Sequence, residues 1–180
     1  MTDATRALSL LSRLSRLADS ESWSDDLNPA QRAALEYLSR ANRFSRAPSH
    51  VAEYLGTTRG TASQTLKALA RKGYVTEDSA PSDRRSIAYQ LTGTGRAVLA
   101  EAGLVQRSLE ATGPDLTARL ARELEHVLAE ALRHSGGRAF GICRSCRHFE
   151  PAAIGGTCRL LSVPLLPEDT RQICHEHAAA

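Results

Sequence analysis

The sequence predicts a mainly α-helical protein with one small β-hairpin and a cysteine-containing C-terminal tail. Leucine and alanine recur at helical spacing through most of residues 1–135. Aromatic residues make up 4% of the 180 residues while hydrophobic residues make up 42%, which favours packed helices over a β-sandwich. All four cysteines lie beyond residue 142, so the tail differs chemically from the rest of the chain.

A leucine stripe marks the first expected helix, residues 4–18. Because the leucines recur every three residues, they share one side of the helix and must pack against something. The chain's own core and a second copy of the chain fit equally well. The stripe consists of Leu8, Leu11, Leu14 and Leu17.

The start of a second helix follows a polar linker. Asn28, Pro29 and Gln31 supply a cap, a proline in the first turn and the residue that completes a capping box. We expect this helix to reach about residue 42. The two arginines just beyond it, Arg43 and Arg46, fit either contacts with a nucleic-acid backbone or an ordinary solvated turn.

Two further helices joined by a short turn come next. Residues 48–55 form the first, which ends at Gly56, and the hydroxyl of Thr57 or Thr58 caps the second, Arg59–Lys72. Gly73 closes it. The apolar face of the second helix consists of Ala62, Leu66 and Leu69. Its other faces carry short polar and cationic side chains: Arg59, Thr61, Ser63, Gln64, Lys67 and Arg71.

A β-hairpin is expected immediately afterwards. Residues 75–78 and 86–91 are short β-prone runs, and the turn-rich segment between them carries Arg84 and Arg85. Helix, turn, helix and hairpin in this order are the parts of a winged helix-turn-helix. Residues 56–96 hold seven lysines and arginines against three acidic residues, so the positive charge gathers where DNA phosphates would need it.

The remaining helices are expected on both sides of a break. Thr92 caps a helix to about Glu110, Gly113-Pro114 interrupts it, and Asp115 caps a long amphipathic helix. Ser135 to Gly137 ends that helix and provides a hinge to the tail.

Residues 28–100 resemble the MarR-type winged helix-turn-helix regulators. The matching stretches are AALEYL, VAEYLGTTRGTASQTLKALARKGYV, SDRRS and LTGTGRAVL. The resemblance implies a homodimer formed by helices from both chain ends and a pseudo-palindromic operator in double-stranded DNA. It does not extend to the last forty or so residues.

The side chains of the expected DNA-binding elements fall into those suited to bases and those suited to phosphates. Arg59, Ser63 and Gln64 are suited to base edges in the major groove, with Thr61 beside them, because arginine and glutamine pair bidentately with guanine and adenine. Lys67 and Arg71 are expected on phosphates. At the wing tip, Arg84 and Arg85 would lie along or in the minor groove.

The four cysteines follow the pattern C-x2-C-x11-C-x15-C, at Cys143, Cys146, Cys158 and Cys174. The sequence carries no targeting segment and no stretch able to span a bilayer, which predicts a cytoplasmic protein without a membrane association. Structural disulfides are rare in that compartment. Four cysteines within 32 residues therefore predict one metal site rather than disulfides.

The spacing favours an iron–sulfur cluster of the form [4Fe–4S] over zinc, because structural zinc usually takes two C-x2-C pairs and only one is present. The tail resembles high-potential iron–sulfur proteins in CRSCRHF, GTCRLL and CHEH, with a shorter second gap and no Trp or Tyr. That resemblance implies the four ligands but not a high reduction potential. Under zinc, one of His148, His175 and His177 could replace a cysteine. Shielding is expected from Phe140, Ile142, Phe149, Leu160, Leu161, Leu165 and Ile173.

These observations predict four regions: a dimerisation helix and linker (1–27), the winged helix-turn-helix (28–92), dimerisation helices (93–135) and a metal-binding tail (136–180). The expected function is transcriptional regulation, with DNA affinity set by a cluster that senses redox state, oxygen, nitric oxide or iron. The alternative is a regulator that binds a small organic ligand and holds structural zinc. An enzyme is not expected, because nucleotide-binding and hydrolase motifs are missing from the sequence.

Overall fold

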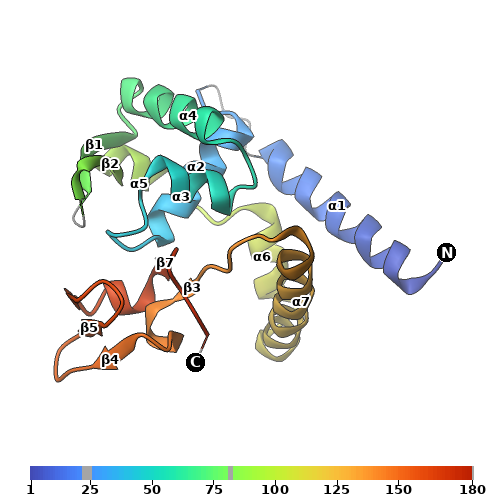
Figure 1. Cartoon of the computed structure of the whole chain (residues 1–180). Helices are drawn as coiled ribbons and strands as arrows, with labels where there is room; N and C mark the ends of the chain where they lie inside the picture. The colour runs from blue at the N-terminus through green and yellow to red at the C-terminus, as the bar shows by residue number, and fades with distance from the viewer. Residues whose placement is uncertain (22–25, 81–82, 180) are drawn as a thin grey trace.

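The computed structural model describes residues 1–21, 26–80 and 83–179, with the side chains of residues 79–86 left out of the description. Its first part is helical apart from one hairpin (Figure 1). The elements are α1 (Asp3–Glu21), α2 (Pro29–Arg40), α3 (Pro48–Tyr54), α4 (Arg59–Arg71), β1 (Val75–Ala80), β2 (Asp83–Leu91), α5 (Gly93–Val98), α6 (Leu104–Ala111) and α7 (Pro114–Ser135).

The tail that follows consists of short strands and turns. Its elements are β3 (Gly141–Ile142), η1 (Cys143–Ser145), β4 (Phe149–Pro151), β5 (Gly156–Cys158), β6 (Val163–Leu165), η2 (Asp169–Arg171) and β7 (Ile173–Cys174). β3 pairs with β7, and β4, β5 and β6 form a separate antiparallel sheet. The hairpin β1–β2 is the predicted wing.

The main core lies where α2, α3, α4 and β1 meet, and we call residues 26–92 the head. Leu35, Tyr37, Val51, Leu66 and Leu69 are fully buried there. Local signals set the element ends. Asn28 and Gln31 form the predicted capping box of α2, the Thr58 side chain accepts from the Thr61 amide at the start of α4, and Gly56 ends the preceding turn with a φ of 61°.

Two expected helix boundaries after the wing are wrong. The single helix predicted from Thr92 to Glu110 is divided, because α5 ends at Val98 and α6 begins at Leu104. The freed Leu104 amide donates to Glu21 of α1, so a tertiary contact stabilises the break. Asp115 does not cap α7: Gly113, with a φ of 88°, occupies that position, and Asp115 lies in the first turn.

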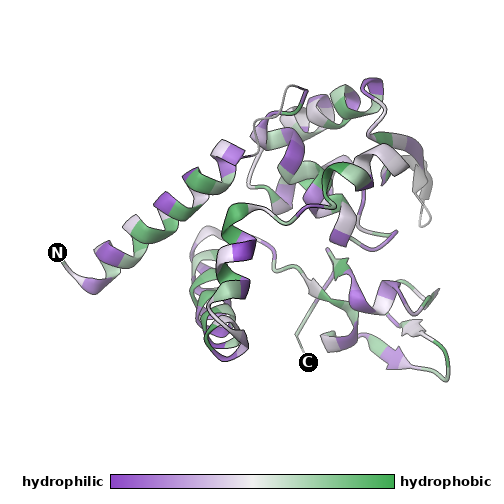
Figure 2. Ribbon diagram, turned by 180° about the vertical axis from the view of Figure 1, so that it is seen from behind, coloured by the Kyte–Doolittle hydropathy of each residue, from purple (hydrophilic) through white to green (hydrophobic). Residues whose placement is uncertain are grey.

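The outer helices keep large apolar side chains in solvent. α1, α6 and α7 have no buried residue among those described, and Figure 2 shows hydrophobic stretches along α1 and α7. The exposed fraction is 66% for Leu8, 58% for Val127 and 57% for Leu128. None of the described helices is both long and apolar enough to cross a membrane.

Candidate nucleic-acid interface and cysteine site

The outward face of α4 carries the predicted reading residues. Arg59, Gln64, Lys67 and Arg71 are exposed, and the described part of the chain gives these four side chains no hydrogen bond or ion pair. Ser63 is half-buried. α4 contains no acidic residue, so its outward face is uniformly cationic or neutral. Such a face is free to contact the phosphates and base edges of DNA.

The position of α4 is fixed by its opposite face. Ala62, Leu66 and Leu69 are 2%, 0% and 0% exposed and join the core with α2 and α3. Thr61 is exposed, and its hydroxyl lies 2.8 Å from that of the capping Thr58. The structure therefore places it in the first turn, where it supports the helix start as well as facing outward.

The wing follows α4 directly, as predicted. Val75 pairs with Leu91 and Glu77 with Tyr89 across the hairpin, and Tyr89 is buried at 1% exposure. The buried Gly95 packs against this junction, since a Cβ there would lie 2.2 Å from the Tyr74 carbonyl oxygen. The predicted minor-groove residues Arg84 and Arg85 belong to β2, but their side chains lie outside the described residues.

Residues 41–47 connect α2 to α3, and we call this segment the α2–α3 loop. It is not the ordinary solvated turn that the sequence allowed as one possibility. Arg43 donates to the Pro164 carbonyl at 2.8 Å, and its Nε lies 3.2 Å from the Asp169 carboxylate. That N–H makes no hydrogen bond within the described residues, so the contact is an ion pair. Arg46 donates to the Ala41 carbonyl. Both arginines are therefore engaged within the protein.

The tail packs directly against this loop (Figure 1). The Asn42 amide donates to the Ile173 carbonyl at 2.9 Å, and Ala41 and Ile173 form a parallel bridge. Phe44 is 6% exposed and belongs to a small core with Cys143, Leu165 and Cys174. A head residue thus completes the core of the tail.

Three of the four cysteines share that small core. Cys143 and Cys174 are buried at 5% exposure each, and the half-buried Cys158 packs against them. The hydrogen bond between Cys143 and Cys174 lowers the pKa of Cys174 to about 6, while the same bond and burial raise the pKa of Cys143. A thiolate is thereby favoured at Cys174, and a thiolate is the form that binds metals.

The fourth cysteine lies at the edge of this group. The Cys146 amide donates to the Cys143 carbonyl at 3.0 Å, which forms the turn of the C-x2-C pair. Its sulphur accepts from the Ala178 amide at 3.5 Å. Among the described residues, no three His, Cys, Asp or Glu side chains stand in the geometry of a single metal ion. All four cysteines are free thiols.

Most of the shielding residues named from sequence occupy other places. Leu165 is buried beside the cysteines, and Phe149 and Leu161 pack against them. Phe140 instead lies edge-on to Tyr37 and Tyr54, with ring centroids 6.1 and 5.2 Å away. Ile173 packs against the head core, whereas Ile142 and Leu160 are 43% and 48% exposed. Sequence reasoning missed Phe44, which shields the cysteines from the head side.

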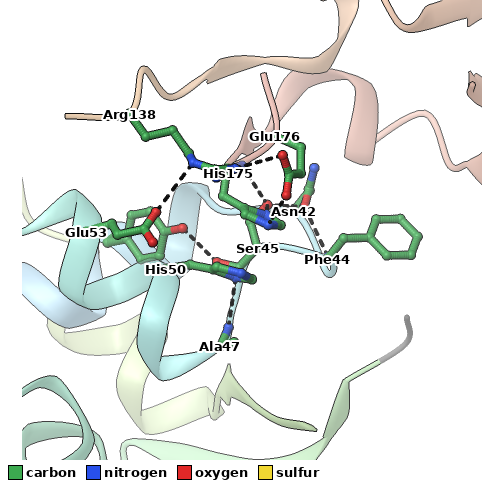
Figure 3. Close-up of polar contacts among 10 residues, drawn as sticks. Asn42, Phe44, Ser45, Ala47, His50, Glu53, Arg138, His175 and Glu176 are labelled. Carbon is green, nitrogen blue, oxygen red and sulfur yellow. Dashed lines mark hydrogen bonds and ion pairs between the residues drawn. The ribbon is translucent and has the colours of Figure 1, made fainter. Parts of the chain in front are cut away.

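The three tail histidines also separate. His175 stacks on His50 of α3 with ring centroids 3.5 Å apart (Figure 3). Burial, followed by the nearby His175, lowers the pKa of His50 to about 4, so His50 is neutral at pH 7. Burial also lowers the pKa of His175. His177 lies 3.1 Å from the Ser145 hydroxyl, and His148 accepts from Arg147.

A salt-bridge network beside the histidines joins head to tail (Figure 3). Arg138 lies 2.7 Å from Glu176 of the tail and 3.7 Å from Glu53 of α3. These pairs are about half exposed, so their main contribution is to hold one arrangement rather than to stabilise the fold strongly. Gly136 ends α7 in the left-handed conformation with a φ of 67°, and Arg138, two residues further on, joins the tail to α3.

A separate cleft of about 800 Å³ lies between α1, α2 and the segment that divides α5 from α6. Positively and negatively charged side chains line the cleft: the arginines are Arg32, Arg40 and Arg107, and the glutamates include Glu21 and Glu36. Arg32 pairs with Glu36 at 3.2 Å and Arg107 with Glu21 at 3.7 Å. The cleft is therefore polar and partly closed by its own ion pairs.

Residues 25–86 match the family model described as the MarR family. This segment covers α2 through most of the wing. No curated protein matches the sequence.

Several solved structures share the fold. A MarR transcriptional regulator from Methanosarcina mazei Go1 has a TM-score of 0.57 at 20% identity, over 72% of this chain and 96% of that one. The S. aureus MepR–DNA complex has a TM-score of 0.53 at 19% identity, over 72% and 98%. PcaV from Streptomyces coelicolor, in complex with its natural ligand, has a TM-score of 0.52 at 21% identity, over 72% and 94%. At these identities the likeness establishes a MarR-like winged helix fold.

Proposed function

We propose that this chain is a MarR-type transcriptional regulator that binds a specific sequence in double-stranded DNA through α4 and the wing. One observation carries the proposal: the exposed cationic side chains of α4 form no hydrogen bond or ion pair with the described residues, and α4 lies in a segment that matches the MarR family. The winged helix places such a helix in the major groove.

The roles within this interface follow from side-chain chemistry. Arg59, Ser63 and Gln64 lie in the first half of α4 and read base edges, with Thr61 between them. Lys67 and Arg71, further along, hold phosphates. Arg84 and Arg85 on the wing contact the minor groove.

The test is operator selection followed by variant titration at fixed salt. Arg59→Ala and Gln64→Ala should each cost roughly 1–3 kcal/mol on the selected operator and relax its specificity. Lys67→Ala should weaken binding to all sequences and reduce the salt dependence. Arg133→Ala is a matched control, because Arg133 is equally exposed but pairs with Glu130 on α7. Unchanged operator affinity in Arg59→Ala and Gln64→Ala would overturn the assignment.

The DNA-binding form is proposed to be a homodimer. The exposed leucines of α1 and α7 support it, because a monomer would leave that apolar surface in water. Two heads one DNA turn apart also suit a pseudo-palindromic operator. Analytical ultracentrifugation should find a dimer at micromolar concentration; a monomer that still binds the operator tightly would contradict this.

The cysteine tail is proposed to hold one iron–sulfur cluster, of the form [4Fe–4S], through Cys143, Cys146, Cys158 and Cys174. The donor set supports it, since three of the four thiols pack in one small core and the sulphur of Cys146, at the edge of that core, accepts a backbone N–H. A cluster would supply redox-dependent charge at the tail. The alternative is zinc, with one of His148, His175 and His177 in place of a cysteine.

Regulation is proposed to follow from the state of this site, with redox conditions, oxygen, nitric oxide or iron as the signal. Anaerobic purification followed by iron, sulphide and zinc analysis tests which metal the site holds. Operator titration of metal-loaded and metal-free protein tests whether the site regulates DNA binding. About one zinc and no iron per chain would refute the cluster. Equal operator affinities of the metal-loaded and metal-free protein would refute the regulation of DNA binding by the metal, but not the metal site itself.

A second function is favoured by the cleft between α1, α2 and the α5–α6 connection. Its arginines suit a small organic anion, and its walls join a dimerisation helix to the head. In that case the tail would be a structural zinc site. A thermal-shift screen of aromatic carboxylates, with Arg40→Ala as the binding-defective variant, separates this function from control by the cysteines.

A further inference from the structure

A chain of hydrogen bonds runs between two cysteines of the tail and passes through the head. The His175 amide, adjacent to Cys174, donates to the Ser45 hydroxyl at 3.0 Å. Ser45 donates to the side-chain oxygen of Asn42 at 2.8 Å, and the Asn42 amide nitrogen donates to the sulphur of Cys143 at 3.3 Å. Figure 3 shows Asn42 and Ser45 between the tail and α3.

Asn42 and Ser45 are both buried where the head meets the tail. Asn42 and Ser45 are 0% exposed, and polar side chains are rarely buried so completely in a loop without a specific partner. The Asn42 oxygen also accepts from the Phe44 amide at 3.0 Å, so one side chain both shapes the α2–α3 loop and contacts the cysteine site.

The same loop contacts the DNA-reading elements. The Arg46 carbonyl accepts from the Tyr89 amide of β2 at 3.0 Å, which joins the loop to the wing. Ala47 caps α3, and α3 packs against α4. A displacement of the α2–α3 loop would therefore also displace the wing and the helices α3 and α4.

We propose that Asn42 and Ser45 are positioning residues of the cysteine site, and that the α2–α3 loop couples the state of that site to the DNA-binding head of the same protomer. This inference rests on the proposed metal site and deepens it. The coupling acts through a direct contact within one protomer and does not require a movement at the Gly136-Gly137 hinge.

The physical reason is the charge on sulphur. A thiolate, whether free or bound to a metal, accepts a stronger hydrogen bond than a neutral or oxidised sulphur does. The Asn42–Cys143 bond should therefore hold the loop firmly when the site is loaded and weaken when the sulphur is oxidised. Hydrogen bonds to the sulphurs in turn tune a cluster and orient its ligands.

Two variants of the full chain test the sulphur contact. Asn42→Asp keeps the oxygen that organises the loop but removes the N–H donated to Cys143. Ser45→Ala removes the link to His175. Arg43→Ala is the matched control, because Arg43 also joins the loop to the tail but reaches Asp169 and Pro164 instead of a cysteine. Each protein is titrated with Co²⁺, whose thiolate charge-transfer bands report the sulphurs, and reconstituted anaerobically with iron and sulphide.

Asn42→Asp and Ser45→Ala should lower Co²⁺ affinity roughly 10–100-fold and shift the charge-transfer bands. Arg43→Ala should keep the wild-type spectrum. In wild type, hydrogen exchange of residues 41–54 should be slower in the loaded protein than in the metal-free protein, and this difference should vanish in Asn42→Asp. Wild-type Co²⁺ affinity and spectrum in both variants would overturn the inference.

Reciprocity provides a test that needs no variant. If the loop couples the two sites, operator DNA must change metal affinity by the same factor by which metal changes operator affinity. A chelator competition with and without operator measures this factor. A wild-type protein that binds neither Co²⁺ nor iron would overturn the metal site and this inference with it. Metal binding that is unaffected by operator, in a protein whose Asn42→Asp and Ser45→Ala variants lose Co²⁺ affinity as expected, would overturn the coupling alone.

Discussion

Phe44→Ala should detach the cysteine tail from the head without unfolding the head. The Phe44 ring is 6% exposed and contacts Cys143, Leu165 and Cys174 of the tail, while the buried residues of the head core do not include it. The substitution therefore removes an interface contact rather than a core residue of α2–α4.

The magnitude follows from burial. Removing a fully buried phenylalanine ring costs about 3–5 kcal/mol, from lost transfer free energy and from the cavity left behind. A cost of about 4 kcal/mol would raise the population with an open tail roughly a thousandfold. Because the tail has few other buried apolar residues, nearly all of this loss should appear as tail opening.

Hydrogen exchange of the full chain measures it. The Asn42 amide, bound to the Ile173 carbonyl, should lose its protection in Phe44→Ala, whereas the amides of Leu66 and Leu69 in α4 should keep theirs. Phe149→Ala is the matched control: it removes a half-buried ring from β4 within the tail and should leave Asn42 protected. Wild-type exchange at residues 41–47 in Phe44→Ala would refute the docked arrangement.

Three further predictions concern the head. Asn28→Ala removes the capping box of α2 and should cost about 1 kcal/mol of unfolding free energy, measured by denaturant titration, whereas Ser20→Ala, in α1, should change little. Gly95→Ala should destabilise by about 1–3 kcal/mol, because a Cβ there meets the Tyr74 carbonyl oxygen, and Gly93→Ala, with open space around it, is the control in the same thermal melt. The pKa of His50 is lowered to about 4 by burial and by His175, Arg138 and Arg59, so the folded protein favours the neutral imidazole. The free energy of unfolding should therefore fall as the pH drops from about 6.5 towards 4. His50→Gln should flatten this part of the stability profile.

The head was predictable from sequence because its signals are local. The capping pair Asn28–Gln31, the glycines that end α3 and α4, and the apolar spacing of Ala62, Leu66 and Leu69 each act within a few residues. The same locality explains the error at residues 99–103. A tertiary contact from Glu21 to Leu104 stabilises the break between α5 and α6, and no pattern within that segment encodes it.

The docking of the tail could not be predicted, because its contacts join residues about a hundred positions apart. Asn42 and Cys143 carry no mutual signal in one sequence. A weak clue existed in the segment ANRFS, where an apolar Phe44 interrupts a polar turn. The cysteine spacing predicts a metal site in the tail, but it does not indicate which surface of the protein the tail meets.

We propose that α4 and the wing bind a specific operator and that the state of the cysteine site sets the affinity. The most direct measurement is titration of the selected operator with anaerobically purified protein before and after metal removal, at one salt concentration and beside a scrambled duplex. We predict specific binding by the loaded dimer and an affinity at least tenfold different after metal removal, which corresponds to about 1.4 kcal/mol. Equal affinity for the operator and the scrambled duplex in both forms would contradict the account.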